Sequence, residues 1–126
     1  MAGRLPVAKT YKLFIDGAFP RSESGRTFPV HSPDGTLLAN AARASRKDLR
    51  DAVRIARVAQ EGWAARTAYN RGQVLYRVAE MLEGRRAELA TLLSDTGLVT
   101  EAAEEEVEAS IDRWVWYAGW SDKVHH

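Results

Sequence analysis

The pattern of the chain changes at Ser45-Arg-Lys-Asp-Leu-Arg-Asp-Ala-Val53, where short extended segments give way to helical spacing. Ser45 is a good N-cap residue, and Asp48 stands three positions later, where a capping box places its carboxylate. From here apolar residues recur at intervals of three and four: Leu49, Ala52, Val53, Ala56, Ala59 and Trp63. The spacing therefore predicts an amphipathic helix of about four turns that ends near Gly62.

A second helix is predicted to begin near Thr67 or Asn70, both of which are suitable caps. Its apolar stripe consists of Val74, Leu75, Val78, Ala79 and Leu82, and it continues through Leu89, Leu92 and Leu93. Gly84 interrupts the pattern and costs about 1 kcal/mol relative to Ala inside a helix, so we expect a kink or a break there. Gly97 is placed to end the stretch.

A third helix is predicted to start with Thr100 as its cap, with several glutamates near its positive end. Its apolar stripe consists of Val107, Ile111, Trp114, Val115 and Ala118. The segment 114–120 carries three of the four tryptophans and is apolar on nearly all sides. This pattern indicates burial against more than one partner.

The residues before Ser45 read as extended segments and turns. Asp16-Gly17 is the dipeptide of a type I′ hairpin turn, so the apolar stretch 11–15 should be followed by a returning strand. Residues 27–31 are predicted to form a short strand, and Pro29 confines it to a sheet edge or to an irregular stretch. Ser32-Pro33-Asp34-Gly35 fits a type I turn, and an extended segment resumes at 36–43.

The predicted fold class is α+β, with N-terminal β-hairpin elements followed by three amphipathic helices. We expect a flexible N-terminus at residues 1–10 and a β-hairpin segment at 11–44. We expect a helical segment at 45–123, which forms one incomplete domain, and a tail at 124–126.

Composition and charge exclude several classes of protein. The net charge is +1, from 18 Lys+Arg against 17 Asp+Glu, whereas nucleic-acid binders of this size carry a basic excess. No apolar run reaches about 18 residues, so we expect no membrane-spanning helix. No apolar segment of a secretory signal follows Met1, which favours a cytoplasmic protein. Cysteine is absent, which removes disulfides, thiolate metal sites and a cysteine nucleophile.

No motif for phosphate or metal chemistry is present. The nine glycines fit neither G-x-G-x-x-G nor the P-loop pattern. His125 and His126 are read as a chain end rather than a metal site, and a lone His31 before a turn is read as structural rather than as a general base. Glu101, Glu104, Glu105 and Glu108 share a helical face. This face is read as complementing the helix dipole, with a carboxylate metal site as the alternative.

Two further features have competing interpretations. The tryptophan-rich stripe is read as core packing, with stacking on a ring or lining of an apolar tunnel as the alternative. Arg85-Arg86 is weak evidence for phosphate binding. From the residues alone, no catalytic constellation can be assembled.

Several short segments resemble the N-terminal region of NAD(P)-dependent aldehyde dehydrogenases. They are Leu13-Phe-Ile-Asp-Gly17, Ser24-Gly25-Arg-Thr-Phe28, Asp48 through Trp63, Asn70-Arg71, Asp95-Thr-Gly97 and Trp116-Tyr-Ala-Gly-Trp120-Ser-Asp-Lys123. Each is weak alone, but their order and spacing across residues 11–123 make the resemblance specific. It implies the N-terminal part of that α/β fold.

The resemblance also implies an activity for the whole family chain, which oxidises an aldehyde to a carboxylic acid with NAD(P)+. The cysteine nucleophile, the glutamate base and the NAD or NADP site follow the matched region in the family. We therefore expect no catalytic residue and no cofactor-binding residue in this chain, and we expect it to be inactive alone.

Two site assignments follow from the resemblance. Some family members hold a monovalent cation at positions that match Asp95 and His31 with its neighbour Val30, although an aspartate making ordinary hydrogen bonds is the favoured interpretation. The third predicted helix borders the substrate entrance in the family, which by register places Glu105, Glu106 or Ala109 there, although their side chains match no substrate-specific pattern. Leu98 stands where the family often has a lysine, so no role of that lysine is expected.

The resemblance leaves two principal hypotheses for function. The chain is an N-terminal portion of an aldehyde dehydrogenase, with the remainder of the enzyme as its partner. Alternatively, it is a non-enzymatic interaction module that docks on full-length subunits. A homo-oligomer is a further assembly compatible with either hypothesis. No nucleic-acid or membrane partner is expected, and nucleic-acid binding through the arginine-rich first helix is the weakest interpretation.

Overall fold

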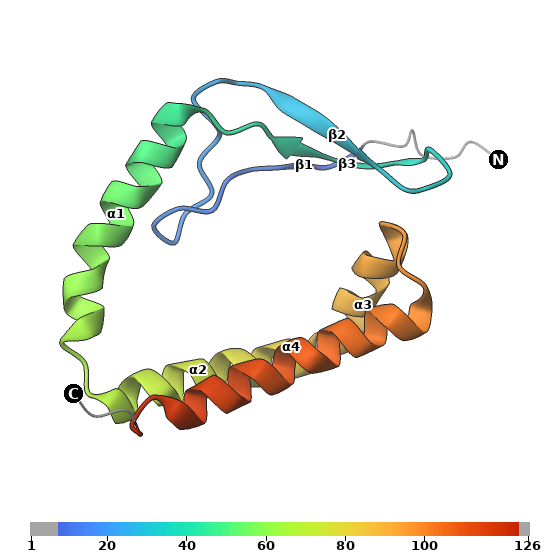
Figure 1. Cartoon of the computed structure of the whole chain (residues 1–126). Helices are drawn as coiled ribbons and strands as arrows, with labels where there is room; N and C mark the ends of the chain where they lie inside the picture. Colours follow the sequence, from blue (N-terminus) through green and yellow to red (C-terminus); the bar gives the residue numbers. More distant parts are fainter. Residues whose placement is uncertain (1–7, 124–126) are drawn as a thin grey trace. The chain divides into compact units, whose positions relative to one another are not determined.

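Three strands and four helices make up residues 8–123, the part of the chain that the computed structural model describes. They are β1 (Thr10–Tyr11), β2 (Thr27–His31), β3 (Leu37–Ala42), α1 (Arg46–Ala64), α2 (Ala68–Gly84), α3 (Arg86–Asp95) and α4 (Thr100–Trp120), labelled in Figure 1. These elements form two compact units divided between Gln60 and Glu61. The predicted flexible segment 1–10 lies mostly outside the described residues, and the predicted tail 124–126 lies wholly outside them.

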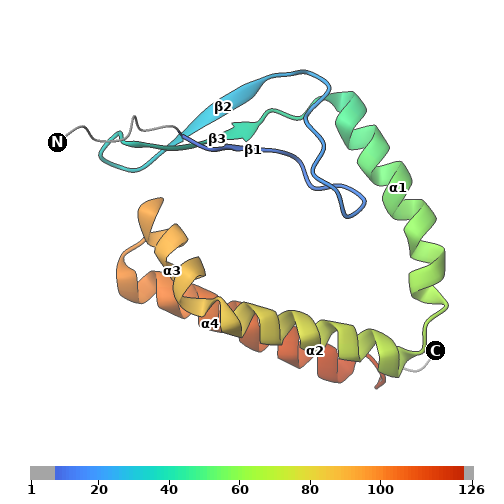
Figure 2. The ribbon, with the colours of Figure 1, turned by 180° about the vertical axis from the view of Figure 1, so that it is seen from behind.

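The first unit contains a mixed sheet in the order β1-β3-β2, seen from behind in Figure 2. The central strand β3 is parallel to β1 and antiparallel to β2, with a bulge in β2 between Val30 and His31. Pro29 lies on β2, which is an edge strand, as predicted, because proline has no N–H to donate to a neighbour. The turn before β3 is also confirmed, with Gly35 N donating to Ser32 O at 2.9 Å.

The hairpin turn at Asp16-Gly17 is confirmed, but its strands are shorter than expected. Asp16 and Gly17 both have positive φ, at 58° and 71°, as a type I′ turn requires. Ile15 and Ala18 pair across the turn as an isolated antiparallel bridge, and Leu13 N donates to Pro20 O at 3.1 Å. The apolar stretch before the turn enters the sheet only at Thr10–Tyr11, and there it pairs with β3 rather than with the returning chain.

The start of α1 is tied to the preceding loop through Asp48. Ser45 and Asp48 form the predicted capping box: Ser45 N donates to Asp48 Oδ2 at 2.8 Å, and Asp48 N donates to Ser45 Oγ at 3.2 Å. Ser22, a buried polar residue, donates its hydroxyl to Asp48 Oδ2 at 2.6 Å. The Ser22 hydroxyl and the Ser45 N–H lower the pKa of Asp48 from 3.8 to about 2, since both bonds favour the charged carboxylate.

The turn between α1 and α2 is closed by local hydrogen bonds. Thr67 caps α2, accepting from Asn70 N at 3.1 Å, as predicted. The guanidinium of Arg71 donates to Ala64 O, the carbonyl of the last residue of α1, at 3.2 Å, and also to Arg66 O in the turn.

The second predicted helix is divided in the structure. Helix α2 ends at Gly84 and α3 begins at Arg86, which confirms the break expected there. The described residues therefore contain four helices, whereas the sequence pattern predicts three. Gly97, with φ of 124°, follows α3 as predicted, and Leu98 N donates to Leu93 O at 3.2 Å. The prediction that Thr100 caps the last helix was wrong: Thr100 is its first residue, and the capping position is occupied by Val99, whose side chain cannot bond the helix end.

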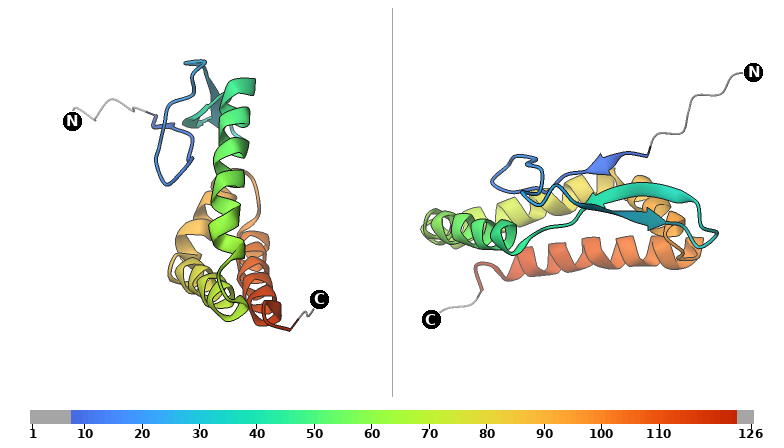
Figure 3. Two further views of the ribbon diagram at one scale, coloured as in Figure 1. Left: turned by 90° about the vertical axis from the view of Figure 1, so that its left-hand side faces the viewer. Right: turned by 90° about the horizontal axis from the view of Figure 1, so that it is seen from above.

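In the second unit α2 and α4 lie side by side and run in opposite directions, as the left panel of Figure 3 and Figure 1 show. Gly72 near the start of α2 lies against Ala118 near the end of α4, where a Cβ atom would come within 3.1 Å of Ala118 O. A small core joins α3 to α4 and contains the buried residues Ala90, Ala103, Val107 and Ile111. Val107, Ile111 and Ala118 of the predicted stripe are buried. The α+β class, extended segments followed by helices, is confirmed.

Candidate functional site

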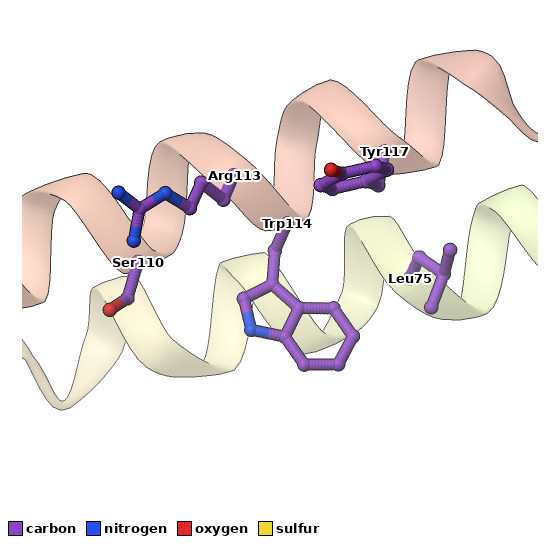
Figure 4. Close-up of a pocket in the computed structure, with 5 residues that line it drawn as sticks. All are labelled: Leu75, Ser110, Arg113, Trp114 and Tyr117. Carbon is purple, nitrogen blue, oxygen red and sulfur yellow. The ribbon is translucent and has the colours of Figure 1, made fainter.

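An open groove of about 370 Å³ lies along α2 and α4 in the second unit. Its lining residues are Leu75 from α2 and Ser110, Arg113, Trp114 and Tyr117 from α4, all shown in Figure 4. The α4 residues are spaced by three and four, so they share one side of the helix. Figure 4 shows the indole of Trp114 extending from α4 across α2, between Ser110 and Leu75.

The groove offers apolar walls and one guanidinium, but no activated nucleophile. The hydroxyl of Ser110 donates to Glu106 O at 2.8 Å, a bond within its own helix. A serine nucleophile needs a neighbouring base, and no such base is bonded to Ser110. Within residues 8–123, Arg113 forms no ion pair. The groove is therefore suited to binding a flat apolar group against its walls and not to carrying out covalent chemistry.

Exposed aromatic rings continue from the groove towards the end of α4. We call the set Trp114, Trp116, Tyr117 and Trp120 the aromatic face. The Trp116 and Trp120 ring centroids are 5.3 Å apart, and Trp116 meets Tyr117 edge to face at 5.0 Å. Trp116 is 56% exposed and Tyr117 is 62% exposed, so the prediction that the tryptophan stripe packs into a core was wrong for these rings. Trp116 and Tyr117 face outward because the inward positions of α4 are held by its smaller residues Ala103, Val107, Ile111 and Ala118.

The glutamate face predicted on α4 is exposed along its length. Glu104 and Glu108 line a second groove, of about 650 Å³, together with residues of α3. Arg86 and Glu83 also line it and form an ion pair at 2.8 Å. Between residues 8 and 123, no group of three or more histidine, aspartate or glutamate side chains is arranged to hold a metal ion.

The remaining predicted site residues lie at element ends or beside the first groove. His31 is the exposed last residue of β2 in the first unit, and Asp95 is the exposed last residue of α3 in the second. Their shared cation site stays a prediction. Ala109 is half-buried on α4, four residues before Arg113 and therefore on the same side of the helix. Its place at a substrate entrance also stays a prediction.

One residue of the groove and one bond of the first unit were not predicted from the sequence. Arg113 was not singled out, although its spacing from Ser110, Trp114 and Tyr117 could have shown that one side of the helix combines aromatic rings with a cation. The bond between Ser22 and Asp48 joins residues 26 positions apart, and no local pattern signals it. No helix within the described residues is long and apolar enough to span a bilayer.

Comparisons with known proteins agree with this architecture. Residues 19–126 match the aldehyde dehydrogenase family. The chain is 38% identical over 119 residues to cytosolic 10-formyltetrahydrofolate dehydrogenase of Xenopus tropicalis, covering 90% of this chain and 13% of that protein. It is 37% identical over 126 residues to mitochondrial benzaldehyde dehydrogenase of Antirrhinum majus, covering 95% of this chain and 24% of that protein.

A solved structure extends the match to three dimensions. The crystal structure of PnpE in complex with nicotinamide adenine dinucleotide superposes with a TM-score of 0.88 at 32% identity. The superposition covers 91% of this chain and 24% of PnpE. The sheet and the helices correspond to the N-terminal part of aldehyde dehydrogenase structures, and the chain spans about a quarter or less of each of these three relatives. Because the family match includes 108 of its 126 residues, the chain belongs to the aldehyde dehydrogenase family.

Proposed function

We propose that these 126 residues are the N-terminal portion of an NAD(P)-dependent aldehyde dehydrogenase, which as a whole oxidises an aldehyde to a carboxylic acid. Family membership supports the reaction class. In that reaction a thiolate attacks the aldehyde carbonyl, and the resulting thioester is hydrolysed. The observation that carries the proposal is the partial coverage of its relatives, since the match spans 90% of this chain but 13% of the Xenopus tropicalis protein. The chain also contains no cysteine. The nucleophile is therefore supplied by other residues of the enzyme, and residues 1–126 alone are inactive.

The coenzyme belongs to the whole enzyme in this proposal. PnpE is a relative solved with nicotinamide adenine dinucleotide. The described residues do not fit a dinucleotide, since Gly17, Gly25 and Gly35 stand in open turns where a Cβ atom would meet nothing within 4 Å. Glycines that cradle a pyrophosphate instead allow a close backbone approach at a helix N-terminus. NAD or NADP is accordingly held by the part of the enzyme beyond these residues.

The contribution of this chain is to pack against the rest of the enzyme through the aromatic face. Apart from the small core, the large apolar side chains of α4 are exposed, and no large side chain is fully buried in residues 8–123. An exposed patch of this kind on a soluble chain marks an interaction surface. Three tryptophans and a tyrosine are also the residue types that contribute most to binding energy at interfaces. A cytoplasmic location of the enzyme stays a prediction.

A complementation experiment tests the proposal. The chain is co-expressed with the remainder of an aldehyde dehydrogenase that lacks the corresponding segment, and formation of reduced nicotinamide from an aldehyde is followed. We expect activity only when both pieces are present. Trp116→Ser should weaken complementation at least tenfold, whereas Val58→Ser, which alters a 75% exposed residue of α1, should leave it unchanged. Aldehyde oxidation by the purified 126-residue chain alone would refute the proposal.

The second candidate function is a non-enzymatic module that docks on full-length subunits, and the same aromatic face favours it. Light scattering with and without a full-length relative separates the two. A mixed complex with an intact relative, together with failed complementation, would favour the docking module. A chain that stays monomeric in the presence of the intact relative, but restores activity to the truncated enzyme, would favour the enzyme portion.

A further inference from the structure

A separate pocket in the first unit collects positive charge. It has a volume of about 360 Å³ and lies between the chain around β1 and the loop that leads into β2. We call it the basic pocket. Its lining residues are Thr10, Tyr11, Lys12, Arg21, Ser22, Gly25, Arg26, Thr27 and Ala42. Three of these nine residues are cationic, three carry aliphatic hydroxyl groups and none is acidic, so the pocket combines positive charge with hydroxyl donors.

The three cations are not neutralised by neighbouring side chains. Across the described residues, Lys12, Arg21 and Arg26 form no ion pair, and their side chains donate no hydrogen bond to another protein group. Like charges held around one concavity repel one another, and a bound anion relieves that repulsion. The pocket therefore presents free donors of the kind that hold anions.

The charge of the first unit increases the attraction for an anion. Residues 1–60 contain eleven Lys and Arg against five Asp and Glu, a formal charge of +6. Three of the five acids already have partners within the unit, and one of these, Asp51, forms an ion pair with Arg50 at 3.8 Å. Asp34 accepts from the Ser32 hydroxyl and from Thr36 N, and Asp48 accepts from Ser22, Ser45 and Glu23 N. Asp48, behind Ser22, is thus engaged by three donors and does not pair with the pocket cations.

We propose that the basic pocket binds the phosphate group of a small soluble ligand. A guanidinium presents two parallel N–H donors to phosphate oxygens, and Arg21 and Arg26 supply two such groups. Lys12 adds a compact charge, and the hydroxyls of Thr10 and Thr27 add neutral donors. The volume is at the lower end of the roughly 300–1,000 Å³ typical of small-molecule sites, which suits a phosphate group with a small substituent. The basic pocket is lined by residues of the first unit and shares no lining residue with the groove of the candidate site, so the two sites are distinct.

Titration with inorganic pyrophosphate tests the proposal on the intact chain. Amide shifts are followed by NMR, and ionic strength is held constant with sodium chloride. We expect saturable shifts confined to the backbone near Thr10, Lys12, Arg21 and Arg26. Arg21→Gln and Arg26→Gln, made separately, should each weaken binding at least fivefold. The matched control is Arg57→Gln, which removes the same charge from an exposed position on α1 outside the pocket.

Each outcome decides the proposal. Loss of binding in both pocket variants, with the control at wild-type affinity and the remaining amide spectrum unchanged, supports it. Equal weakening of pyrophosphate binding in all three variants would show attraction to net charge alone and would overturn the proposal. Amide shifts that do not saturate would also overturn it. If one pocket variant loses its folded spectrum, the other decides, and Arg21→Lys should keep part of the affinity. The titration does not depend on aldehyde oxidation. A failure to bind pyrophosphate therefore leaves the proposed aldehyde dehydrogenase function unaffected.

Discussion

Substitution of Gly72 by alanine tests how closely α2 and α4 approach each other. Gly72 is buried, and an added Cβ atom would lie 3.1 Å from Ala118 O and 3.3 Å from Ser121 Cβ. The nearer neighbour is a backbone carbonyl of α4, which cannot rotate away as a side chain would. The methyl group can therefore be accepted only if the two helices separate by a few tenths of an ångström.

Two opposing effects set the magnitude. Replacing glycine by alanine inside a helix stabilises it by about 1 kcal/mol. Overpacking of a tight contact costs about 1–3 kcal/mol, and the backbone contact at Gly72 favours the upper part of that range. We expect Gly72→Ala to lower the free energy of unfolding by about 1 kcal/mol, which in a unit of this size corresponds to roughly 4–8 °C in melting temperature.

The matched control is Gly62→Ala, also in the second unit, where an added Cβ would meet nothing within 4 Å. It should stabilise the chain by about 0.5–1 kcal/mol, because only the helix propensity changes. Both variants are compared by thermal unfolding followed by circular dichroism. Ser121→Gly in the Gly72→Ala background should recover part of the loss. If Gly72→Ala stabilises the chain as much as Gly62→Ala does, the close approach of α2 and α4 is wrong.

Three further changes test other parts of the structure. The pKa of Asp48 is lowered from 3.8 to about 2, so it contributes stability above 3.8 that is lost as the pH falls towards 2. Asp48→Asn should flatten acid unfolding followed by circular dichroism. Part of the dependence of stability on pH should remain in this variant, because the pKa of Asp34 is lowered to the same extent. An unaltered pH dependence would contradict the Ser22–Asp48 bond. Ile111→Ala, in the core, should cost about 2–4 kcal/mol in urea unfolding, and a loss below about 1 kcal/mol would contradict that core. Thr67→Ala removes the bond to Asn70 N and should cost about 1 kcal/mol of thermal stability, with Thr67→Ser close to wild type.

Features that depend on neighbouring residues were predictable. The turn at Asp16-Gly17 and the cap at Thr67 each involve residues within about four positions, so the residue types largely determine the backbone geometry. The break near Gly84 follows from the same kind of local preference. The cap at Thr100 failed because a threonine one residue inside the helix no longer has the extended backbone that a capping residue needs.

The orientation of side chains on α4 was less predictable. Its apolar residues surround the helix, so periodicity alone did not show which of them face inward. Packing against α2 and α3 selected the small residues for the buried side and left Trp116 and Tyr117 exposed. The groove beside Trp114 likewise needs Leu75 from another helix, and a single helical pattern contains no information about that partner.

The amino-acid sequence by itself determined the helices, the tight turns, the α+β class and, through the order of its short motifs, the family. These properties arise from interactions between residues close together in the chain, and for such interactions the preferred conformation depends on residue type. Tertiary structure alone decided the parallel pairing of β1 with β3, the bond from Ser22 to Asp48 and the collection of Lys12, Arg21 and Arg26 around one pocket. These features join groups that are brought together only when the intervening loops close. The entropy cost of that closure is offset by contacts throughout the fold, so residues close together in the sequence do not determine it.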